Sequence, residues 1–135
     1  MAARDKFEQT RKAVIEFNQI QVAKWLQGEE WKPESAKGGG ISDPTAIKGI
    51  YLADVWRGKL ATLERRERDL LGLIRGTLED VEQVRTYLGN EHASILIQRY
   101  IDGLEWRDVA YHGKRIPRST GKLKVRQAFD WLDGR

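Results

Sequence analysis

The chain has 135 residues, a length typical of about one domain, and this excludes a large multidomain enzyme. Apolar residues make up 40% of the sequence and charged residues 33%, which is typical of a helical globular protein with a modest core. Because cysteine is absent, disulfide scaffolds, thiolate metal sites and cysteine nucleophiles are excluded. No apolar run reaches the roughly 18 to 20 residues of a membrane span, and charged residues occupy the region where a signal peptide needs an apolar block. We therefore expect no membrane association and a location in the cytosol.

The net charge of +4 is distributed unevenly along the chain. Residues 1–88 carry 15 basic and 14 acidic side chains, whereas residues 89–135 carry nine basic and six acidic ones. One part of the C-terminal segment contains six cationic residues and no acidic residue: Lys114, Arg115, Arg118, Lys122, Lys124 and Arg126. Such a concentration of positive charge is typical of proteins that bind polyanions.

The first predicted element is a helix over about residues 4–27, where large apolar residues recur at helical spacing. Glycine, proline, serine and charged residues then dominate residues 28–45, which we expect to form a loop or a flexible linker. The end of this segment contains a helix-start signal, Ser42, Asp43 and Pro44. A short oxygen-bearing side chain can accept a hydrogen bond from an unpaired amide there, and proline is tolerated in the first helical turn.

No proline interrupts the next segment, which keeps apolar residues three and four positions apart as far as Leu88. We expect one long helix or two stacked helices, with any break at Gly72 and Gly76. An unbroken helix would extend over about 65 Å and would need a partner for its apolar stripe. That partner is either the first helix, folded back as an antiparallel hairpin, or a second copy of the chain. Since no strand-like alternation is visible, the expected fold class is all-α, with a helical body over residues 1–88.

The remaining residues, 89–135, are predicted to form a helix-turn-helix domain. A helical run over residues 92–101 ends at Asp102-Gly103, where glycine can adopt the left-handed conformation of a sharp turn. A second short helix is predicted over residues 105–111, and a third, basic helix over residues 117–132. Two helices joined by a tight turn and followed by a basic helix are the pattern of a helix-turn-helix.

The promoter-reading terminal domain of bacterial sigma factors, of the region-four type, has a signature that resembles residues 96–110, LIQRYIDGLEWRDVA. Its recognition helix is similar to residues 116–132, IPRSTGKLKVRQAFDWL. Phage regulators of the RinA and ArpU type resemble the chain further upstream, in GGGISDPT and in the long charged helix that contains WRGKL. The resemblance implies an activator of late phage genes, whose helical body contacts host RNA polymerase or mediates self-association.

The chain departs from the sigma-factor pattern at two places. The turn between Tyr111 and Ile116 is one residue longer than in the family, and basic residues replace its usual apolar residue. Gly121 stands where the family has a branched or small apolar residue. We expect weaker core packing at Gly121, where glycine also costs about 1 kcal/mol of helix propensity relative to alanine.

Helical stepping of about 100° per residue separates two faces of the last helix. One face is predicted to be buried and consists of Gly121, Val125, Ala128, Phe129 and Leu132. The opposite side is predicted to read base edges in the major groove through Arg118, Ser119, Lys122, Leu123 and Arg126. Phosphate contacts, which set affinity and salt dependence, are expected from Lys114, Arg115 and Lys124. Leu123 is the decisive residue, because a buried Leu123 would mean that the helix is rotated.

The sequence places no nucleophile, base and orienting residue together, so we predict no enzymatic activity, no cofactor and no metal. The leading hypothesis is a sequence-specific transcription regulator that binds double-stranded DNA in the cytosol of a bacterial host. It contacts RNA polymerase or forms a homo-oligomer through the long helix. Two alternatives stay open. The first is a DNA-packaging recognition protein similar to a phage terminase small subunit, and the second is a structural helical protein whose basic tail is only solvated.

Overall fold

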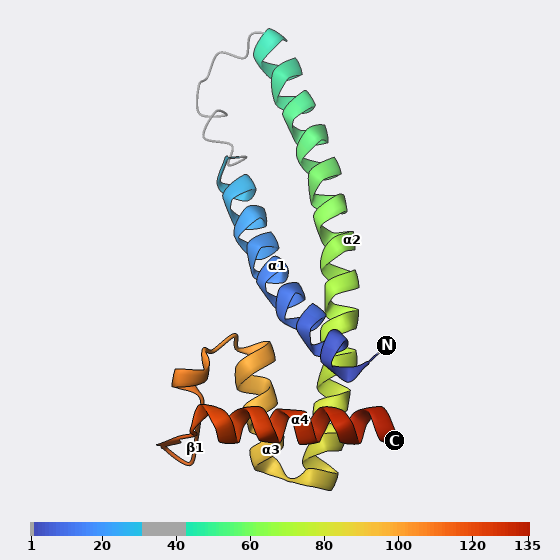
Figure 1. The fold of residues 1–135 in the computed structure, drawn as a ribbon. Helices are drawn as coiled ribbons and strands as arrows, with labels where there is room; N and C mark the ends of the chain where they lie inside the picture. The colour runs from blue at the N-terminus through green and yellow to red at the C-terminus, as the bar shows by residue number, and fades with distance from the viewer. Residues whose placement is uncertain (1, 31–42) are drawn as a thin grey trace. The chain divides into compact units, whose positions relative to one another are not determined.

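The computed structural model of the chain describes residues 2–30 and 43–135, and most of these residues are helical (Figure 1). Two long helices come first: α1 spans Ala3–Glu30, and α2 spans Asp43–Leu88. The C-terminal elements are α3 (Asn90–Leu96), the π-helical turn η2 (Ile97–Ile101), the 3-10 turn η3 (Trp106–Asp108), the strands β1 (Ala110–Tyr111) and β2 (Lys114–Arg115), and α4 (Arg118–Gly134). The predicted all-α fold class is confirmed. Among the described residues, no helix has both the length and the apolar composition needed to cross a membrane.

The chain forms two compact units, and α1 and α2 each contribute residues to both. Unit 1 consists of Met1–Ile15 and Leu70–Arg135, and unit 2 consists of Glu16–Asp69. The sequence predicts separate domains over residues 1–88 and 89–135. In unit 1, however, the first turns of α1 and the last turns of α2 share one core with the C-terminal elements.

The core of unit 1 is centred on Phe7 of α1, whose side chain is completely buried. Its ring centroid lies 5.5 Å from that of Tyr100 in an edge-on arrangement, and 5.2 Å from that of Phe129 on α4. Further buried side chains come from α2 and α3: Val81, Val84, Ile95 and Leu96. Because one aromatic ring from α1 fills the centre of this cluster, the C-terminal elements depend on α1 for a complete core.

Polar contacts fix the antiparallel pairing of α1 and α2 in unit 1. The hydroxyl groups of Thr10 and Thr77 share a buried hydrogen bond. The Lys6 ammonium lies 2.7 Å from the carboxylate of Asp80, which also lies 3.0 Å from the guanidinium of Arg135. The nearly buried Asp80 therefore has two cationic partners, which compensate for the loss of its hydration. In unit 1, α1 therefore packs against the apolar stripe of α2, as predicted by the alternative in which the first helix folds back as an antiparallel hairpin.

Unit 2 buries little apolar surface within its described side chains. Of the described side chains at positions 16–26 and 54–69, Ile20 is the one apolar side chain that is buried. Charged contacts join the two helices instead: Arg66 donates two hydrogen bonds of 2.8 Å to Glu16. Glu67 accepts hydrogen bonds from Gln21 and Lys24. The pairing of α1 and α2 in unit 2 therefore relies on polar contacts much more than on a core.

The predicted long helix is continuous from Asp43 to Leu88, and no break occurs at Gly72 or Gly76. It begins at Asp43, within the predicted helix-start signal. The linker predicted over residues 28–45 lies mostly outside the described residues. Its first three and last three positions belong to α1 and α2, because α1 extends to Glu30 and α2 begins at Asp43.

The prediction of a second helix over residues 105–111 is wrong. Only Trp106–Asp108 forms a helical turn, and the chain then extends into β1, which pairs antiparallel with β2. His112 and Gly113 connect the two strands with φ values of 53° and 75°. Positive φ at both residues of a two-residue loop is the geometry that matches the twist of a β-hairpin. The C-terminal part is therefore helix, hairpin and helix, in place of the predicted helix-turn-helix.

Gln98 explains why this segment is extended. Its side-chain amide donates to the Ala110 carbonyl at 2.7 Å, and its side-chain oxygen accepts from the Ala110 amide at 3.0 Å. The Gln98 side chain thus occupies the edge of β1 as a neighbouring strand would. Because the backbone groups of Ala110 are already paired in this way, they are not available for helical hydrogen bonds. A single side chain from η2 therefore favours the hairpin over the predicted helix.

Candidate functional site

The outward side of α4 is the first part of the candidate site, and its orientation agrees with the sequence prediction. The five residues predicted to be buried on α4 are the ones that the structure buries: Gly121, Val125, Ala128, Phe129 and Leu132. The five predicted base-contact residues are exposed: Arg118, Ser119, Lys122, Leu123 and Arg126. Leu123 is 52% exposed, so the helix is not rotated toward the alternative orientation.

The hairpin and Pro117 fix the start of α4. The Ile116 amide donates to the Val109 carbonyl at 3.0 Å, which extends the hairpin contacts by one residue. Pro117 is the N-cap, and no side-chain hydrogen bond caps the helix. The Gly121 amide donates to the Pro117 carbonyl at 2.9 Å and closes the first helical turn. The hairpin therefore brings its own basic residues next to the N-terminal turns of α4.

Gly121 improves the packing of the core, and the weaker packing expected there is wrong. A Cβ atom at this position would lie 2.7 Å from Cζ3 of Trp106, closer than a side chain can approach. Glycine is therefore the residue that lets the Trp106 ring lie directly against α4. In return, the Trp106 ring occupies the space that a side chain at position 121 would fill.

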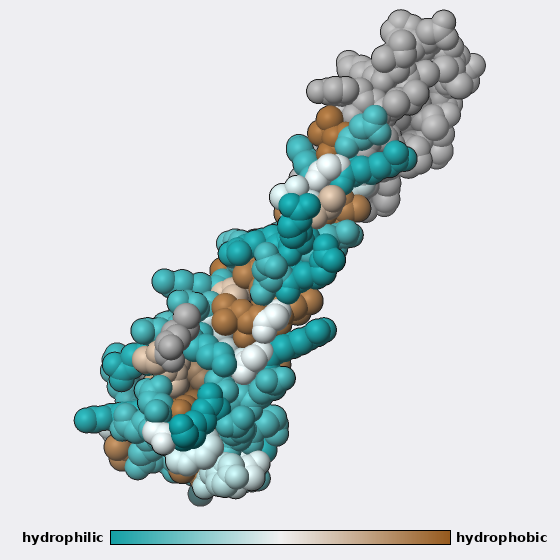
Figure 2. All heavy atoms as spheres, turned by 90° about the vertical axis from the view of Figure 1, so that its right-hand side faces the viewer, coloured by the Kyte–Doolittle hydropathy of each residue, from teal (hydrophilic) through white to brown (hydrophobic). Residues whose placement is uncertain are grey.

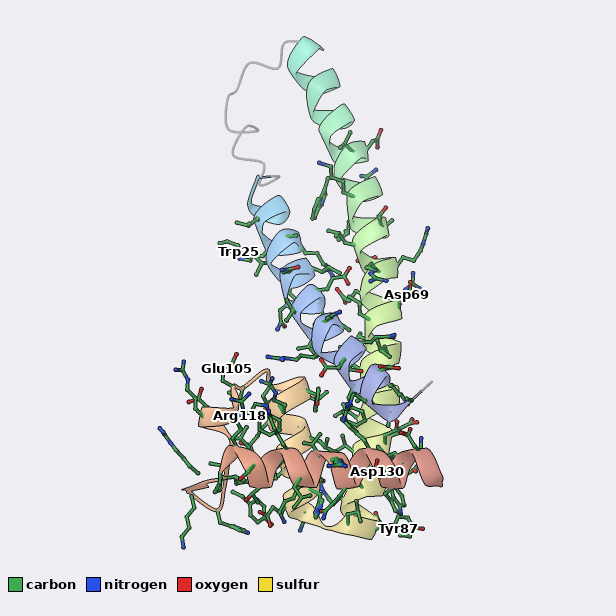
Figure 3. All side chains as sticks on the ribbon, in the orientation of Figure 1. Trp25, Asp69, Tyr87, Glu105, Arg118 and Asp130 are labelled. Atoms are coloured by element: carbon green, nitrogen blue, oxygen red, sulfur yellow. The ribbon has the colours of Figure 1, made fainter. Side chains whose placement is uncertain are left out.

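The Trp106 ring forms part of the wall of an open hollow of about 950 Å³ in unit 1. We call it the basic hollow, because its charged lining consists of five cations and one carboxylate: Arg99, Arg107, Arg115, Arg118, Lys122 and Glu105. Ile116 and Pro117 complete the wall. Figure 3 shows Glu105 and Arg118 on the same side of unit 1, near the start of α4.

Arg99 is the most constrained cation of the basic hollow. Its guanidinium donates a hydrogen bond of 2.9 Å to the Leu104 carbonyl and lies over the Trp106 ring, 5.1 Å from the ring centroid. Its side chain is 15% exposed and lies 3.7 Å from Glu105. Glu105 also lies 3.9 Å from Arg11 on α1, and its own side chain is 61% exposed. Arg99 therefore has a fixed orientation, whereas Glu105 shares weak contacts with two arginines.

The other cations of the site are largely unpaired. The closest carboxylate to Arg107 is that of Asp108, at 3.9 Å, and the Arg107 side chain is 83% exposed. Among the described residues, no ion pair within 4 Å includes Lys114, Arg115, Arg118, Lys122 or Arg126. Lys124 differs, because its ammonium lies 3.1 Å from Glu91 on α3 and its side chain is 23% exposed. Seven of the eight predicted contact residues are thus exposed, and Lys124 is held by a carboxylate.

A second, smaller hollow of about 380 Å³ has Trp106 and Lys122 in common with the basic hollow. Arg4 and Arg126 add positive charge to its lining, and Glu8 adds one carboxylate. Burial raises the pKa of the Tyr100 hydroxyl in its wall, so this group stays neutral at physiological pH. The two hollows together extend the cationic surface from the hairpin along the first half of α4.

No family model, curated protein or solved structure matches this chain. The chemistry of the site must therefore be inferred from its own residues. Within the described residues, no group of three or more His, Asp or Glu side chains could hold a metal ion. The arrangement offers a set of exposed hydrogen-bond donors with positive charge, next to the exposed side of α4.

Sequence reasoning missed three charged residues of the basic hollow: Arg99, Glu105 and Arg107. These three residues precede the segment that contains the six cations. A helix over residues 105–111, as predicted, gives no reason for their side chains to lie close to that segment. The available signal was the pair His112-Gly113, because histidine and glycine both tolerate the positive φ of a two-residue hairpin loop. A hairpin at His112-Gly113 reverses the direction of the chain, so Arg115 lies close to residues that precede the hairpin.

Proposed function

We propose that the chain is a sequence-specific transcription regulator that binds double-stranded DNA through α4. The observation that carries the proposal is the exposed first half of α4, where Lys122, Leu123 and Arg126 lie opposite the buried face. An α-helix fits the major groove, and cationic side chains on its exposed side match the negative potential of DNA.

Each exposed residue of α4 suits one kind of contact. Arg118, Lys122 and Arg126 can donate to guanine, Ser119 can bind either partner of a base pair, and Leu123 can contact a thymine methyl group. Lys114 and Arg115 in the hairpin suit phosphate contacts, because they are exposed and lie next to the start of α4. The resemblance to sigma factors and to RinA and ArpU regulators supports a role in activating late phage genes in the host cytosol, through contact with RNA polymerase.

The decisive experiment begins with selection of preferred duplexes from a random pool. Leu123→Ala and Arg126→Ala are then compared with the unchanged chain on the selected duplex and on random DNA. Each substitution should reduce discrimination by about 5- to 150-fold, which corresponds to about 1–3 kcal/mol per base contact. Arg57→Ala is the matched control, because Arg57 is an exposed arginine of unit 2 that lies 3.6 Å from Asp54.

Selection that enriches no sequence would contradict the proposal. So would undiminished discrimination by both α4 variants, because the exposed side of α4 would then have no part in reading DNA. Circular dichroism of each variant verifies that helicity is retained.

The second candidate is a DNA-packaging recognition protein similar to a phage terminase small subunit. It is favoured by exposed apolar side chains of α1 in unit 2, because self-association needs such a surface: Val22, Trp25 and Leu26. Trp25 is 64% exposed and projects from α1 on the side away from α2 (Figure 3). Hydrophobic patches also interrupt the mainly hydrophilic face shown in Figure 2. Sedimentation distinguishes the candidates: a ring of eight or more copies supports packaging, and a monomer or dimer supports regulation.

A further inference from the structure

We propose that the basic hollow is a phosphate-binding site that takes neighbouring phosphate groups of one nucleic-acid strand. The proposal rests on the proposed function for the source of the phosphates, and it shares Arg118 and Lys122 with the proposed base contacts. It assigns a role to Arg99, Glu105 and Arg107, which the major-groove contacts do not use.

The charge of the hollow selects the class of ligand. Its lining residues carry five cations and one carboxylate, so their net charge of +4 equals that of the whole chain. A neutral or cationic ligand would leave these charges uncompensated in a concave wall, where potential is focused. An anionic ligand with more than one charge compensates them, and a nucleic-acid backbone supplies one charge per nucleotide.

The geometry of the cations favours phosphate among anions. Four of the five cations are arginines, whose planar guanidinium groups match the oxygen spacing of phosphate better than an ammonium does. Arg99 is already oriented by the Leu104 carbonyl and by Trp106, so binding requires little further ordering of this side chain. Pro117 and Arg118, at the start of the 17-residue helix α4, line the same hollow, and the positive end of that helix adds to the attraction.

The volume of the hollow favours an extended ligand over one small ion. At about 950 Å³ it lies near the upper end of the roughly 300–1,000 Å³ range of ligand sites. Its exposed cation Arg107 and its constrained cation Arg99 lie in the same wall, so a single monoatomic anion would leave most donors unused. An extended strand with successive phosphates uses several donors at once.

Glu105 provides a test that loss of folding cannot imitate. It is the one carboxylate in the lining, and it lies 3.7 Å from Arg99. A phosphate would compete with Glu105 for this guanidinium and would be repelled by its negative charge. Replacing Glu105 with the neutral, isosteric glutamine should therefore strengthen binding.

The experiment compares Glu105→Gln, Arg107→Ala and the control Arg57→Ala in the full chain. Affinity for a duplex of random sequence is measured over a series of salt concentrations. In a second arm, inorganic pyrophosphate is titrated while the indole N–H signal of Trp106 is followed by NMR. Arg107→Ala should lower the slope of log affinity against log salt by about one, on every sequence alike. Glu105→Gln should strengthen binding by about two- to five-fold.

Each outcome bears on the proposal. Random DNA that binds equally to all three variants overturns the phosphate site and leaves α4 recognition intact. Absence of DNA binding, together with pyrophosphate binding that Glu105→Gln strengthens and Arg107→Ala weakens, contradicts the proposed function and supports the site for a free phosphate ligand. Changes in both arms support the nucleic-acid backbone as the source. No response in either arm overturns both proposals.

Discussion

At the scale of single residues, Gly121 shows how a helix-disfavouring residue can be required by its surroundings. Glycine in a helix costs up to about 1 kcal/mol relative to alanine, so propensity alone favours its replacement. The Trp106 ring reverses this preference, because the atom nearest to a Cβ at position 121 belongs to a rigid indole, not to a flexible chain. Trp106 is also the ring over which Arg99 lies, so Gly121 acts on the basic hollow through one aromatic neighbour.

We predict that Gly121→Ala destabilises the protein by about 1–3 kcal/mol, because the added methyl group overpacks the contact with Trp106. Gly72→Ala is the matched control, since a Cβ at this helical position meets no atom within 4 Å. That variant should be more stable by about 0.5–1 kcal/mol. Thermal unfolding followed by circular dichroism measures both changes. Stabilisation by both substitutions would mean that Trp106 does not pack against α4.

At the same scale, the single side chain of Gln98 determines the conformation of a neighbouring segment. We predict that Gln98→Ala costs about 1–3 kcal/mol, because it leaves both backbone groups of Ala110 without their partner. Amide hydrogen exchange of Ala110 and Ile116 should accelerate selectively. Ser94→Ala is the control. The Ser94 hydroxyl accepts one hydrogen bond from the Gln98 side-chain amide, and this hydrogen bond does not involve the hairpin. Equal acceleration in both variants would argue against Gln98 as the anchor of β1.

At the scale of elements, the sequence predicts those that depend on periodicity and fails for those that depend on one contact. The helices over residues 3–30, 43–88 and 118–134 follow from apolar spacing, and the buried face of α4 was predicted residue by residue. The hairpin was missed, because strands of two residues have no measurable alternation. Its stability comes from Gln98, which is twelve residues from Ala110 in the sequence. Local patterns do not report such a contact.

The paired helices of unit 2 lead to a prediction about pH. The hydrogen bond from Arg66 lowers the pKa of Glu16, and hydrogen bonds from Gln21 and Lys24 lower the pKa of Glu67. Both carboxylates therefore bind fewer protons in the folded chain than in the unfolded chain. Their contribution to stability is present above the ordinary value of 4.5 and is lost as pH falls through the lowered pKa values.

Thermal unfolding between about pH 6 and about pH 3 should therefore show a loss of stability that the double variant Glu16→Gln, Glu67→Gln lacks. The double variant should be less stable than the unchanged chain at neutral pH and equal to it in acid. Glu64→Gln is the control, because Glu64 forms no ion pair within the described residues. The same acid response in the double variant would assign the effect to other carboxylates.

At the scale of the whole molecule, the most consequential departure from the sequence prediction concerns where the core is completed. The sequence favours an independent C-terminal domain, because residues 89–135 contain every motif of the recognition pattern. The structure completes their core with Phe7 from α1 and with Val81 and Val84 from α2. Long-range packing of this kind leaves no local trace in the sequence. The exposed side of α4 is nevertheless predicted correctly, because helical periodicity alone determines which side of the helix is exposed.

We predict that the isolated fragment 89–135 does not fold, because it lacks the side chains that fill its centre. In the full chain, Phe7→Ala should cost about 3–5 kcal/mol, whereas Phe7→Leu should cost less because it retains apolar volume. Near-ultraviolet circular dichroism and dispersion of the NMR spectrum report the outcome. A fragment 89–135 with native-like dispersed signals would show that the first turns of α1 are dispensable for its fold.

The contact between Ala3 and Asp133 has a practical consequence for measurement. The Ala3 amide donates to the Asp133 carboxylate at 2.7 Å, so the beginning of α1 is fastened to the last turn of α4. Arg118 starts the same helix, and 15 helical residues separate these positions by roughly 22 Å. A fluorophore coupled to the C-terminus would therefore stand at the far end of α4 from the basic hollow, near enough to report on a labelled oligonucleotide by energy transfer without obstructing the hollow.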